Sequence, residues 1–349
     1  MKASPLVNLG ADRVRMKDQR DVDRQQATVQ HLLDRFYTDK EEEQYELQVV
    51  ADEVGMGKTF VALATAFAML EARREDPEEQ KNASVHVLVL VPNNDALFRK
   101  WNKEVKEFVK RCVPEDKRTE VSSRFRRVEV ERLDELVAAL CQRNGPEVVV
   151  AKTSALAGKV RNFDAKARLV LATAFRVWAN AFRLDARERL LRGGEKWQWP
   201  ADPRGFGQLD ELQEQIPLEL APLVKHIESE LGGERGEPLL EACRECATPY
   251  KHNREALLVD IRKKAVEIYK EAVIARLTRA IPLVIVDEAH NWKNGPSKGS
   301  NNYREFARWI APRARRLLLL TATPFQLRPD EMLEILKASD DMDIPEDRF

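Results

Sequence analysis

Cysteine is scarce in this sequence, with four residues among 349. So few cysteines exclude the disulfide scaffold on which many small secreted domains depend. Long hydrophobic runs are absent as well: the longest nearly apolar stretch, Phe60–Leu70, is interrupted by Thr65 and is far shorter than the roughly 20 residues of a membrane-spanning helix. The first residues, MKASPLVNLGADR, lack the apolar core of a secretion signal. We therefore expect a reduced, cytoplasmic protein with no membrane partner.

An excess of charge of either sign is also missing, because 58 Lys and Arg residues balance 58 Asp and Glu residues. This balance excludes a uniformly cationic protein that coats nucleic acid, but it is compatible with a local basic groove. Hydrophobic residues make up 43% of the chain, which is enough for a sizeable core. The length fits two domains, or one domain with a large insertion.

Short runs rich in Val, Leu and Ile predict buried strands. They are Leu47–Ala51, Val85–Pro92, Glu147–Ala151, Pro282–Val286 and Arg316–Thr321. Most of these runs lack polar alternation, as is typical of parallel strands that are covered by helices on both faces. Helical periodicity follows two of the runs, in Thr59–Arg74 and Leu97–Val109. The alternation of strands and helices predicts an α/β fold with a parallel sheet and helices on both faces.

The pattern changes between residues 161 and 279, where helix-like stretches dominate and no convincing strand is found. Residues 161–204 hold 10 Lys or Arg and 5 Asp or Glu, whereas residues 205–248 hold 3 and 10. We expect an N-terminal extension over residues 1–23, an α/β lobe formed by 24–160 and 280–349, and a mostly helical insertion over 161–279.

The charge segregation in the insertion has two interpretations. Its charged residues either form solvated helix faces, or the basic half contacts nucleic acid. The residues that would make the second interpretation true are Arg183, Arg187, Arg189 and Arg192, with Trp178, Trp197 and Trp199 nearby.

A glycine-containing loop between the first run and the first helix predicts a phosphate site. Gly55, Met56 and Gly57 would let backbone N–H groups point at phosphate oxygens, next to the positive end of a helix. Lys58 would reach the β- and γ-phosphates, and the Thr59 hydroxyl would bind Mg²⁺. The general pattern has Gly where this chain has Asp52. The alternative is an ordinary glycine-rich turn before a helix.

Two acids follow the run Pro282–Val286 directly. Ligands of parallel α/β sheets bind at the carboxyl ends of the strands, which is where Asp287 and Glu288 would lie. Asp287 could hold Mg²⁺, and Glu288 could polarise the water that attacks the γ-phosphate. Two acids in a surface turn would be the alternative, but it does not account for the phosphate loop upstream.

These motifs resemble superfamily 2 helicases and translocases. Asp287-Glu288-Ala289-His290 is similar to their DEAH box, and Asp52-Glu53 before Gly-x-Gly-Lys-Thr resembles the Swi/Snf-type branch. The resemblance covers roughly residues 24–160 and 280–337 and implies a RecA-like first lobe that binds ATP and Mg²⁺ and acts on double-stranded DNA.

The same resemblance assigns further roles to single residues. Pro92, Trp101 and Thr153 would contact nucleic acid, and either Gln25 or Gln26 would read the adenine, with Gln26 taken as the candidate. The residues that would couple hydrolysis to motion are His290, Thr321 and Thr323.

The second lobe of such motors brings arginines to the γ-phosphate, and no Gln-x-x-Gly-Arg-like segment is found here. We therefore expect a first lobe that needs a second RecA-like lobe, in the same longer chain or in another subunit. Two alternatives remain open: an RNA helicase lobe, or a non-catalytic ATP-binding module whose insertion docks a partner.

Cys243 and Cys246, with His252 nearby, have half the spacing of a zinc site. A complete site would need a second pair of ligands. Ordinary reduced cysteines are the alternative.

Overall fold

The computed structural model describes residues 1–37, 46–52, 55, 57–156, 163–178, 216–248, 253–292 and 301–322. The chain divides into two compact units. The first comprises Met1–Arg132, Ala139–Lys159 and Arg279–Phe349, and the second comprises Leu133–Ala138 and Val160–Thr278. The second unit thus includes a short segment, Leu133–Ala138, that the sequence analysis places in the lobe.

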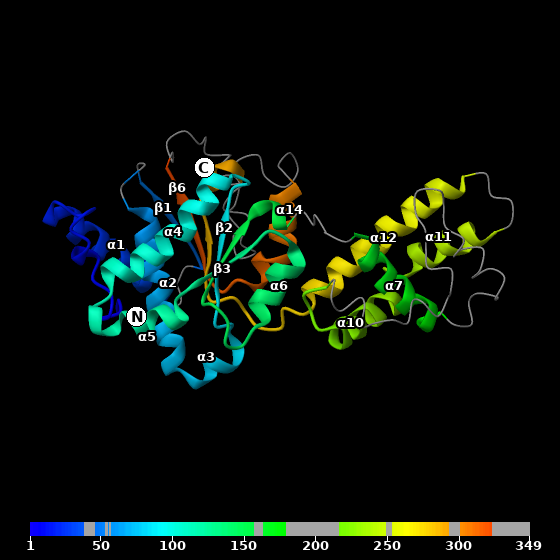
Figure 1. The fold of residues 1–349 in the computed structure, drawn as a ribbon, viewed down its shortest axis with the longest axis horizontal. Coiled ribbons are helices and arrows are strands. Elements are labelled where there is room, and N and C mark those ends of the chain that lie inside the picture. Colours follow the sequence, from blue (N-terminus) through cyan, green and yellow to red (C-terminus); the bar gives the residue numbers. More distant parts are fainter. Residues whose placement is uncertain are drawn as a thin grey trace, which may run out of the picture. The chain divides into compact units, whose positions relative to one another are not determined.

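A six-stranded sheet in the order β1-β6-β5-β2-β4-β3 forms the centre of the first unit (Figure 1). All of its pairings are parallel. The strands are β1 (Leu47–Ala51), β2 (Val87–Val91), β3 (Arg127–Val130), β4 (Val148–Lys152), β5 (Val284–Val286) and β6 (Leu317–Thr321). Because β6 lies between β1 and β5, the segments that follow these three strands leave the same edge of the sheet side by side.

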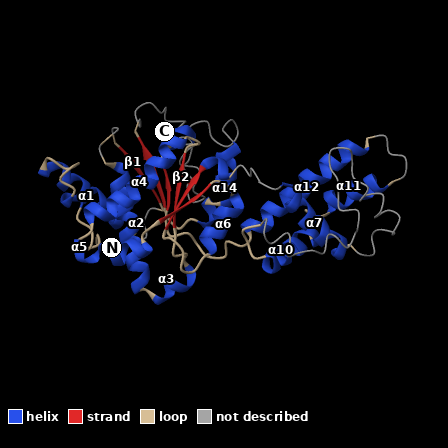
Figure 2. Ribbon diagram, in the orientation of Figure 1, coloured by secondary structure: helices blue, strands red, loops and turns tan. Residues whose placement is uncertain are grey.

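The four inner strands, β6, β5, β2 and β4, are buried over nearly their whole length, which explains their near-continuous hydrophobic runs. Alternate residues of the central strands join helices α1, α2, α4 and α5 in one core cluster; they are Val87, Val89, Val91, Val148, Val150, Ile285, Leu318 and Leu320. The intervening residues are equally buried; they include Leu88, Leu90, Val149, Val284 and Leu319. In Figure 2, α1, α2 and α4 lie on one side of the sheet and α14 lies on the other. The fold is the α/β fold with a parallel sheet and helices on both faces that the sequence predicts.

Three helices of the first unit begin at a residue whose side chain caps them. The helices of this unit are α1 (Gln19–Phe36), α2 (Lys58–Glu75), α3 (Pro77–Asn82), α4 (Asp95–Cys112), α5 (Glu115–Arg124) and α14 (Asn301–Trp309), and α6 (Leu133–Cys141) is shared between the units. Asp18, Asp76 and Asn94 each accept hydrogen bonds from the first backbone amides of α1, α3 and α4. Helices α2, α5 and α6 lack a side-chain cap, and at α2 the N-cap residue is Gly57, which offers no side chain.

Two parts of this unit differ from the sequence-based expectation. Strand β3 was not predicted: it lies at the edge of the sheet, and Arg127 and Glu129 interrupt its apolar pattern. The N-terminal segment is not a separate extension either, because α1 already begins at Gln19. Upstream of it, Leu9 is buried in the core cluster and the Asn8 backbone N–H donates to the Cys112 carbonyl at 2.8 Å.

The described residues of the second unit contain helices and no strand. Its helices are α7 (Phe163–Val177), α10 (Leu220–Gly232), α11 (Glu237–Ala247) and α12 (Arg254–Ile274), and α12 packs against the other three. Lys166 and Asp134 form an ion pair inside this unit, with side chains 1% and 3% exposed. Such a pair is costly to bury, and the Tyr269 hydroxyl lies 3.4 Å from the same carboxylate.

Cys243 and Cys246 are both buried on α11, and burial raises the pKa of both thiols. Raised thiol pKa values disfavour the thiolates that zinc requires. Within the described ranges, no group of three His, Cys, Asp or Glu side chains could hold a metal ion, and His252 lies outside those ranges.

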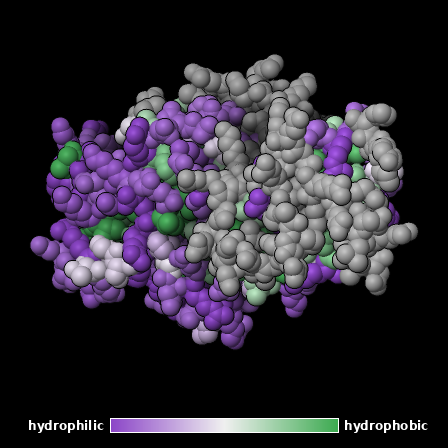
Figure 3. Space-filling view, turned by 45° about the vertical axis from the view of Figure 1, so that its right-hand side comes forward, coloured by the Kyte–Doolittle hydropathy of each residue, from purple (hydrophilic) through white to green (hydrophobic). Residues whose placement is uncertain are grey.

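Polar side chains dominate the coloured part of the face shown in Figure 3, with only scattered apolar patches. The large hydrophobic side chains exposed among the described residues are Val14, Val177 and Val259. No helix in the described part of the chain is long and apolar enough to cross a membrane.

Candidate nucleotide site

The loop between β1 and α2 has the backbone geometry of a phosphate site at both of its described glycines. Gly55 and Gly57 have φ values of 89° and 90°, a left-handed region that side chains rarely adopt. At Gly57 a second constraint applies, because a Cβ atom there would lie 2.1 Å from the Gln25 side-chain nitrogen. Met56, between them, lies outside the described residues.

Helix α2 starts directly after this loop and is firmly held in the core. No side chain caps its N-terminus, and the positive end of the helix dipole lies there. The helix is buried over most of its circumference, including Phe60, Leu63 and Phe67. A positive helix end fixed in this way, with Lys58 and Thr59 in its first turn, can hold phosphate groups.

Asp52 holds both cations that lie next to the loop. The Lys58 ammonium donates to the Asp52 backbone carbonyl at 2.5 Å, and the Arg24 guanidinium pairs with the Asp52 carboxylate at 2.5 Å. The Asp52 backbone N–H donates in turn to the carbonyl of Thr321, the last residue of β6, at 3.3 Å. The link to α1 needs the aspartate side chain and would be lost with glycine, whereas the bonds to Lys58 and to the sheet edge use backbone groups that glycine also has.

The two acids lie at the end of β5. The Asp287 backbone N–H donates to the Leu90 carbonyl at 2.9 Å, which extends the sheet pairing with β2 by one bond. One oxygen of the Asp287 carboxylate, Oδ1, accepts from the Glu288 backbone N–H at 3.0 Å. The other, Oδ2, accepts from the indole N–H of Trp101 at 2.6 Å.

Glu288 has an unusual backbone conformation. Its φ of 51° is the only positive value found at a non-glycine residue in the described ranges. Strained backbone of this kind costs about 1–3 kcal/mol and is concentrated at functional sites. His290, in the short helix η5 (Ala289–Trp292), places its Nδ1 atom 3.3 Å from the Glu288 carboxylate.

These elements enclose one cavity of about 350 Å³ in the first unit. It is lined by the loop residues Gly55, Gly57, Lys58 and Thr59, by Asp287 and Glu288, by Gln25 and Arg24 of α1, by Lys100 and Glu104 of α4, and by Arg15, Met16, Asp21, Phe60 and Ala322. Residues from five separate parts of the sequence therefore meet around a single space. The cavity combines cations and helix N–H groups that suit phosphates with carboxylates that suit a divalent cation.

Gln25 lines this cavity and Gln26 does not, which corrects the choice of Gln26 as the nucleotide contact. Gln25 is 4% exposed and lies against Gly57. Gln26 is exposed, and its side chain lies 3.5 Å from the Asn8 amide oxygen, next to a different pocket. The apolar residues of α1 lie on the side of the helix that carries Gln25, which explains the difference.

Trp101 cannot be a nucleic-acid contact, because its side chain is fully buried. The apolar face of α4, which it shares with Phe98, Val105 and Phe108, packs into the core and takes the indole with it. Thr153 is also buried, at 7% exposure, and its hydroxyl accepts from the Asn302 amide at 3.4 Å. Neither residue offers a free surface.

Pro92 is half-buried and follows β2, two residues before the Asn94 cap of α4. Of the proposed coupling residues, Thr321 ends β6 and is buried, while Thr323 lies outside the described residues. The basic arginines of the insertion, from Arg183 to Arg192, also lie outside them.

Sequence reasoning missed the cations that line the cavity from outside the loop. Arg24 precedes Gln25 on α1, so the glutamine motif could have pointed to it. No sequence motif points to Arg15. Its guanidinium lies 3.4 Å from the centre of the Phe60 ring, and burial lowers its pKa. Lys100 lies next to Trp101 on α4 and gives no pattern of its own.

Thr59 and Asp287 are the residues that fit a magnesium ion. Both line the same cavity, and a hydroxyl with a carboxylate leaves most ligand positions to phosphate oxygens and water. A site of this kind needs no cluster of three acidic or imidazole ligands, which agrees with the lack of one among the described residues.

One family of known proteins is similar to this chain. Residues 20–176, just under half of the chain, match the sequence model of the family described as type III restriction enzyme, res subunit. The domain that this family model describes is the N-terminal lobe of superfamily 2 helicases, and domains of that kind generally bind ATP with Mg²⁺. The match includes the phosphate loop and ends before Asp287 and Glu288. No curated protein matches the chain. The similarity indicates an ATP-dependent, helicase-like lobe.

Proposed function

We propose that this chain is the ATP-binding first lobe of a translocase that acts on double-stranded DNA, with a DEAH box in the Swi/Snf-like branch. The observation that carries the proposal is the single cavity in which Lys58 and Thr59 of the loop meet Asp287 and Glu288 of β5. Gln25, placed between α1 and Gly57, supports a purine nucleotide as the ligand.

Each residue has a role that follows from its chemistry. Lys58 leaves the Asp52 carbonyl and binds the β- and γ-phosphates, together with the N–H groups at the start of α2. Thr59 and Asp287 would hold Mg²⁺, which would supply positive charge to the phosphate oxygens. Glu288 accepts a proton from the attacking water. His290, whose Nδ1 lies 3.3 Å from the Glu288 carboxylate, would couple hydrolysis to motion.

A second RecA-like lobe, in the same longer chain or in another subunit, would complete the motor. The resemblance of the Asp52-Glu53 loop to the Swi/Snf-type branch favours duplex DNA over RNA. The basic half of the insertion would add phosphate contacts, whose number sets the salt dependence of binding.

Nucleotide binding tests the proposal directly. Lys58→Ala should weaken binding of a fluorescent ATP analogue with Mg²⁺ by about 10- to 150-fold, because a charge-assisted hydrogen bond contributes about 1.5–3 kcal/mol. Lys103→Ala, on the exposed side of α4, removes the same charge away from the cavity and serves as the control. Equal affinity of the wild type and Lys58→Ala would overturn the assignment of the loop.

A further inference from the structure

We propose that Trp101 is a positioning residue that holds the Asp287 carboxylate in the orientation that binds Mg²⁺ together with the nucleotide. The inference rests on the proposed function and deepens it. Its basis is the hydrogen bond of 2.6 Å from the Trp101 indole N–H to Asp287 Oδ2.

The Asp287 carboxylate is fixed from two directions. The Glu288 backbone N–H donates to Oδ1 at 3.0 Å, while Trp101 donates to Oδ2. Each oxygen therefore has one donor, and because an ionised carboxylate has about four acceptor sites, the remaining lone pairs are available to a cation. Donors on both oxygens also restrict rotation of the carboxylate, so its free lone pairs keep a defined direction.

A tryptophan is well suited to this position. The indole is apolar over most of its surface, which lets it lie at 0% exposure on the face of α4 that enters the core. Its N–H group is a donor only, so it cannot compete with a carboxylate for a cation. Because the donor is neutral, it leaves the negative charge of Asp287 intact, which a lysine or arginine at the same distance would offset.

The bond also joins two distant parts of the chain. Trp101 lies on the helix that follows β2, and Asp287 lies at the end of β5, the neighbour of β2 in the sheet. Any shift of α4 along the sheet would move the indole away from the carboxylate. Outer-shell partners of metal ligands typically contribute about 10- to 100-fold to metal affinity.

Trp101→Phe removes the donor and keeps an aromatic ring. A matched control is Trp309→Phe on α14, because Trp309 is also buried, at 2% exposure, and its indole N–H has no hydrogen-bond partner within the described residues. Both variants lose part of an indole from the core, and only the first loses a bond to Asp287.

The measurement is the equilibrium affinity for a fluorescent ATP analogue as a function of Mg²⁺ concentration, with a second titration in EDTA. For Trp101→Phe we expect the half-saturating Mg²⁺ concentration to rise by about 10- to 100-fold. Its affinity for the nucleotide in EDTA should stay at the wild-type value. Trp309→Phe should change neither quantity.

A double-mutant cycle tests whether Trp101 affects Mg²⁺ binding through Asp287. In an Asp287→Asn background, Trp101→Phe should cause no further shift in the half-saturating Mg²⁺ concentration, since the carboxylate through which it acts is gone. The indole ¹H–¹⁵N resonance that disappears in Trp101→Phe should also shift in the wild type when Mg²⁺ and the nucleotide are added.

If Trp101→Phe unfolds, Trp101 can be replaced by benzothienylalanine, which keeps both rings and has sulfur in place of the N–H group. This variant tests the hydrogen bond to Asp287 without loss of aromatic packing. An unchanged Mg²⁺ dependence in a folded variant would overturn the positioning role while leaving nucleotide binding in place. Failure of the wild type to bind the nucleotide, with or without Mg²⁺, would instead overturn the proposed function.

Discussion

Gln25 lies where a nucleotide base could be read. Its side chain is buried between α1 and the loop, so close to Gly57 that a methyl group on that glycine would collide with it. An amide has both donor and acceptor groups, as recognition of an adenine edge requires. The neighbouring Gln26 points to another pocket and provides a natural comparison.

Gln25→Ala should therefore reduce affinity for ATP by about tenfold, the equivalent of about 1.4 kcal/mol for lost hydrogen bonds to the base, and should narrow the preference for ATP over GTP. Gln26→Ala should leave both unchanged. Competition of unlabelled ATP and GTP against a fluorescent nucleotide measures both quantities. An unchanged affinity for ATP and an unchanged preference for ATP over GTP in Gln25→Ala would show that the buried glutamine does not contact the base.

The periodicity of α1 contains enough information to choose between these two glutamines. Val22, Val29 and Leu33 recur at helical spacing on the buried face, and Gln25 falls on that face whereas Gln26 does not. The burial of Trp101 follows from the same reasoning applied to α4. The hydrogen bond of Trp101 to Asp287 could not be predicted in this way, because Asp287 is 186 residues away and no local pattern connects the two residues.

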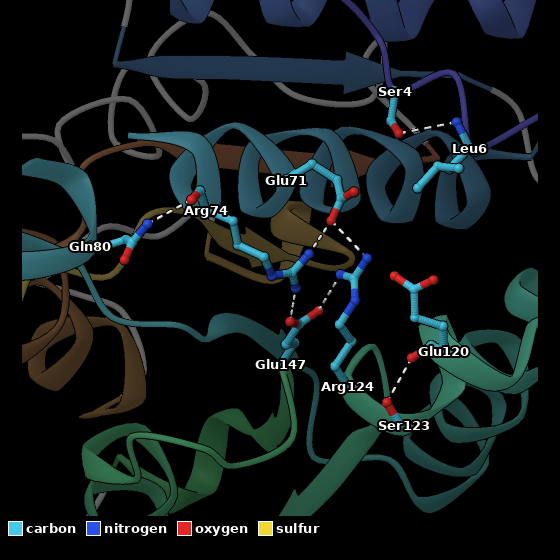
Figure 4. Close-up of polar contacts among 9 residues, drawn as sticks. All are labelled: Ser4, Leu6, Glu71, Arg74, Gln80, Glu120, Ser123, Arg124 and Glu147. Atoms are coloured by element: carbon cyan, nitrogen blue, oxygen red, sulfur yellow. Dashed lines mark hydrogen bonds and ion pairs between the residues drawn. The ribbon is translucent and has the colours of Figure 1, made fainter. Parts of the chain in front are cut away.

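At the scale of secondary-structure elements, a network of four charged residues joins helices and sheet at the opposite end of α2 from the loop. Arg74 pairs with Glu71 on α2 and with Glu147, which precedes β4. Arg124, at the end of α5, contacts Glu71 at 2.8 Å and Glu147 at 3.6 Å (Figure 4). Burial lowers the pKa of Arg74 to about 10. The network holds the far end of the helix whose first turn contains Lys58 and Thr59.

Glu147→Ala should destabilise the protein by about 3 kcal/mol, because it leaves two arginines close together beside a single carboxylate. Glu147 itself is only 6% exposed, so water cannot replace it readily. Glu120→Ala is the control, since Glu120 is exposed and its contact to Lys117 is 3.8 Å long. Urea denaturation of both variants gives the two free energies of unfolding. Similar free energies of unfolding for the two variants would mean that the network contributes no more to stability than a surface ion pair does.

Four of the five predicted strands lie inside the sheet, and nearly all of their residues are buried. Strands β1 and β3 form its two edges. The sequence of β1 is still mostly apolar, whereas Arg127 and Glu129 interrupt the pattern of β3, so β3 was not predicted. The helical insertion is visible as a loss of strand pattern. The sequence does not reveal that Leu133–Ala138 belongs to the same unit, because the link is a long-range ion pair between Asp134 and Lys166.

At the scale of the whole molecule, the proposed function would leave the residues around the cavity with only part of what phosphoryl transfer requires. Two arginines line the cavity, but both have other partners. Arg24 pairs with Asp52, and Arg15 lies over the Phe60 ring and 3.6 Å from the Asp12 carboxylate. An arginine that neutralises charge in the transition state typically contributes about 10³- to 10⁵-fold in rate, or roughly 4–7 kcal/mol of barrier.

We therefore expect residues 1–349 alone to hydrolyse ATP very slowly, with or without duplex DNA. Addition of a second RecA-like lobe should raise phosphate release steeply when duplex DNA is present, and Glu288→Gln should abolish that gain while ATP remains bound. Stimulation by RNA in place of DNA would favour the RNA helicase alternative. Turnover of several molecules per second by residues 1–349 alone would contradict the need for an external arginine. In that case Arg24→Ala and Arg15→Ala would show whether the cavity provides the required arginine itself. Substitution of the arginine that reaches the γ-phosphate would abolish turnover and leave ATP binding in place.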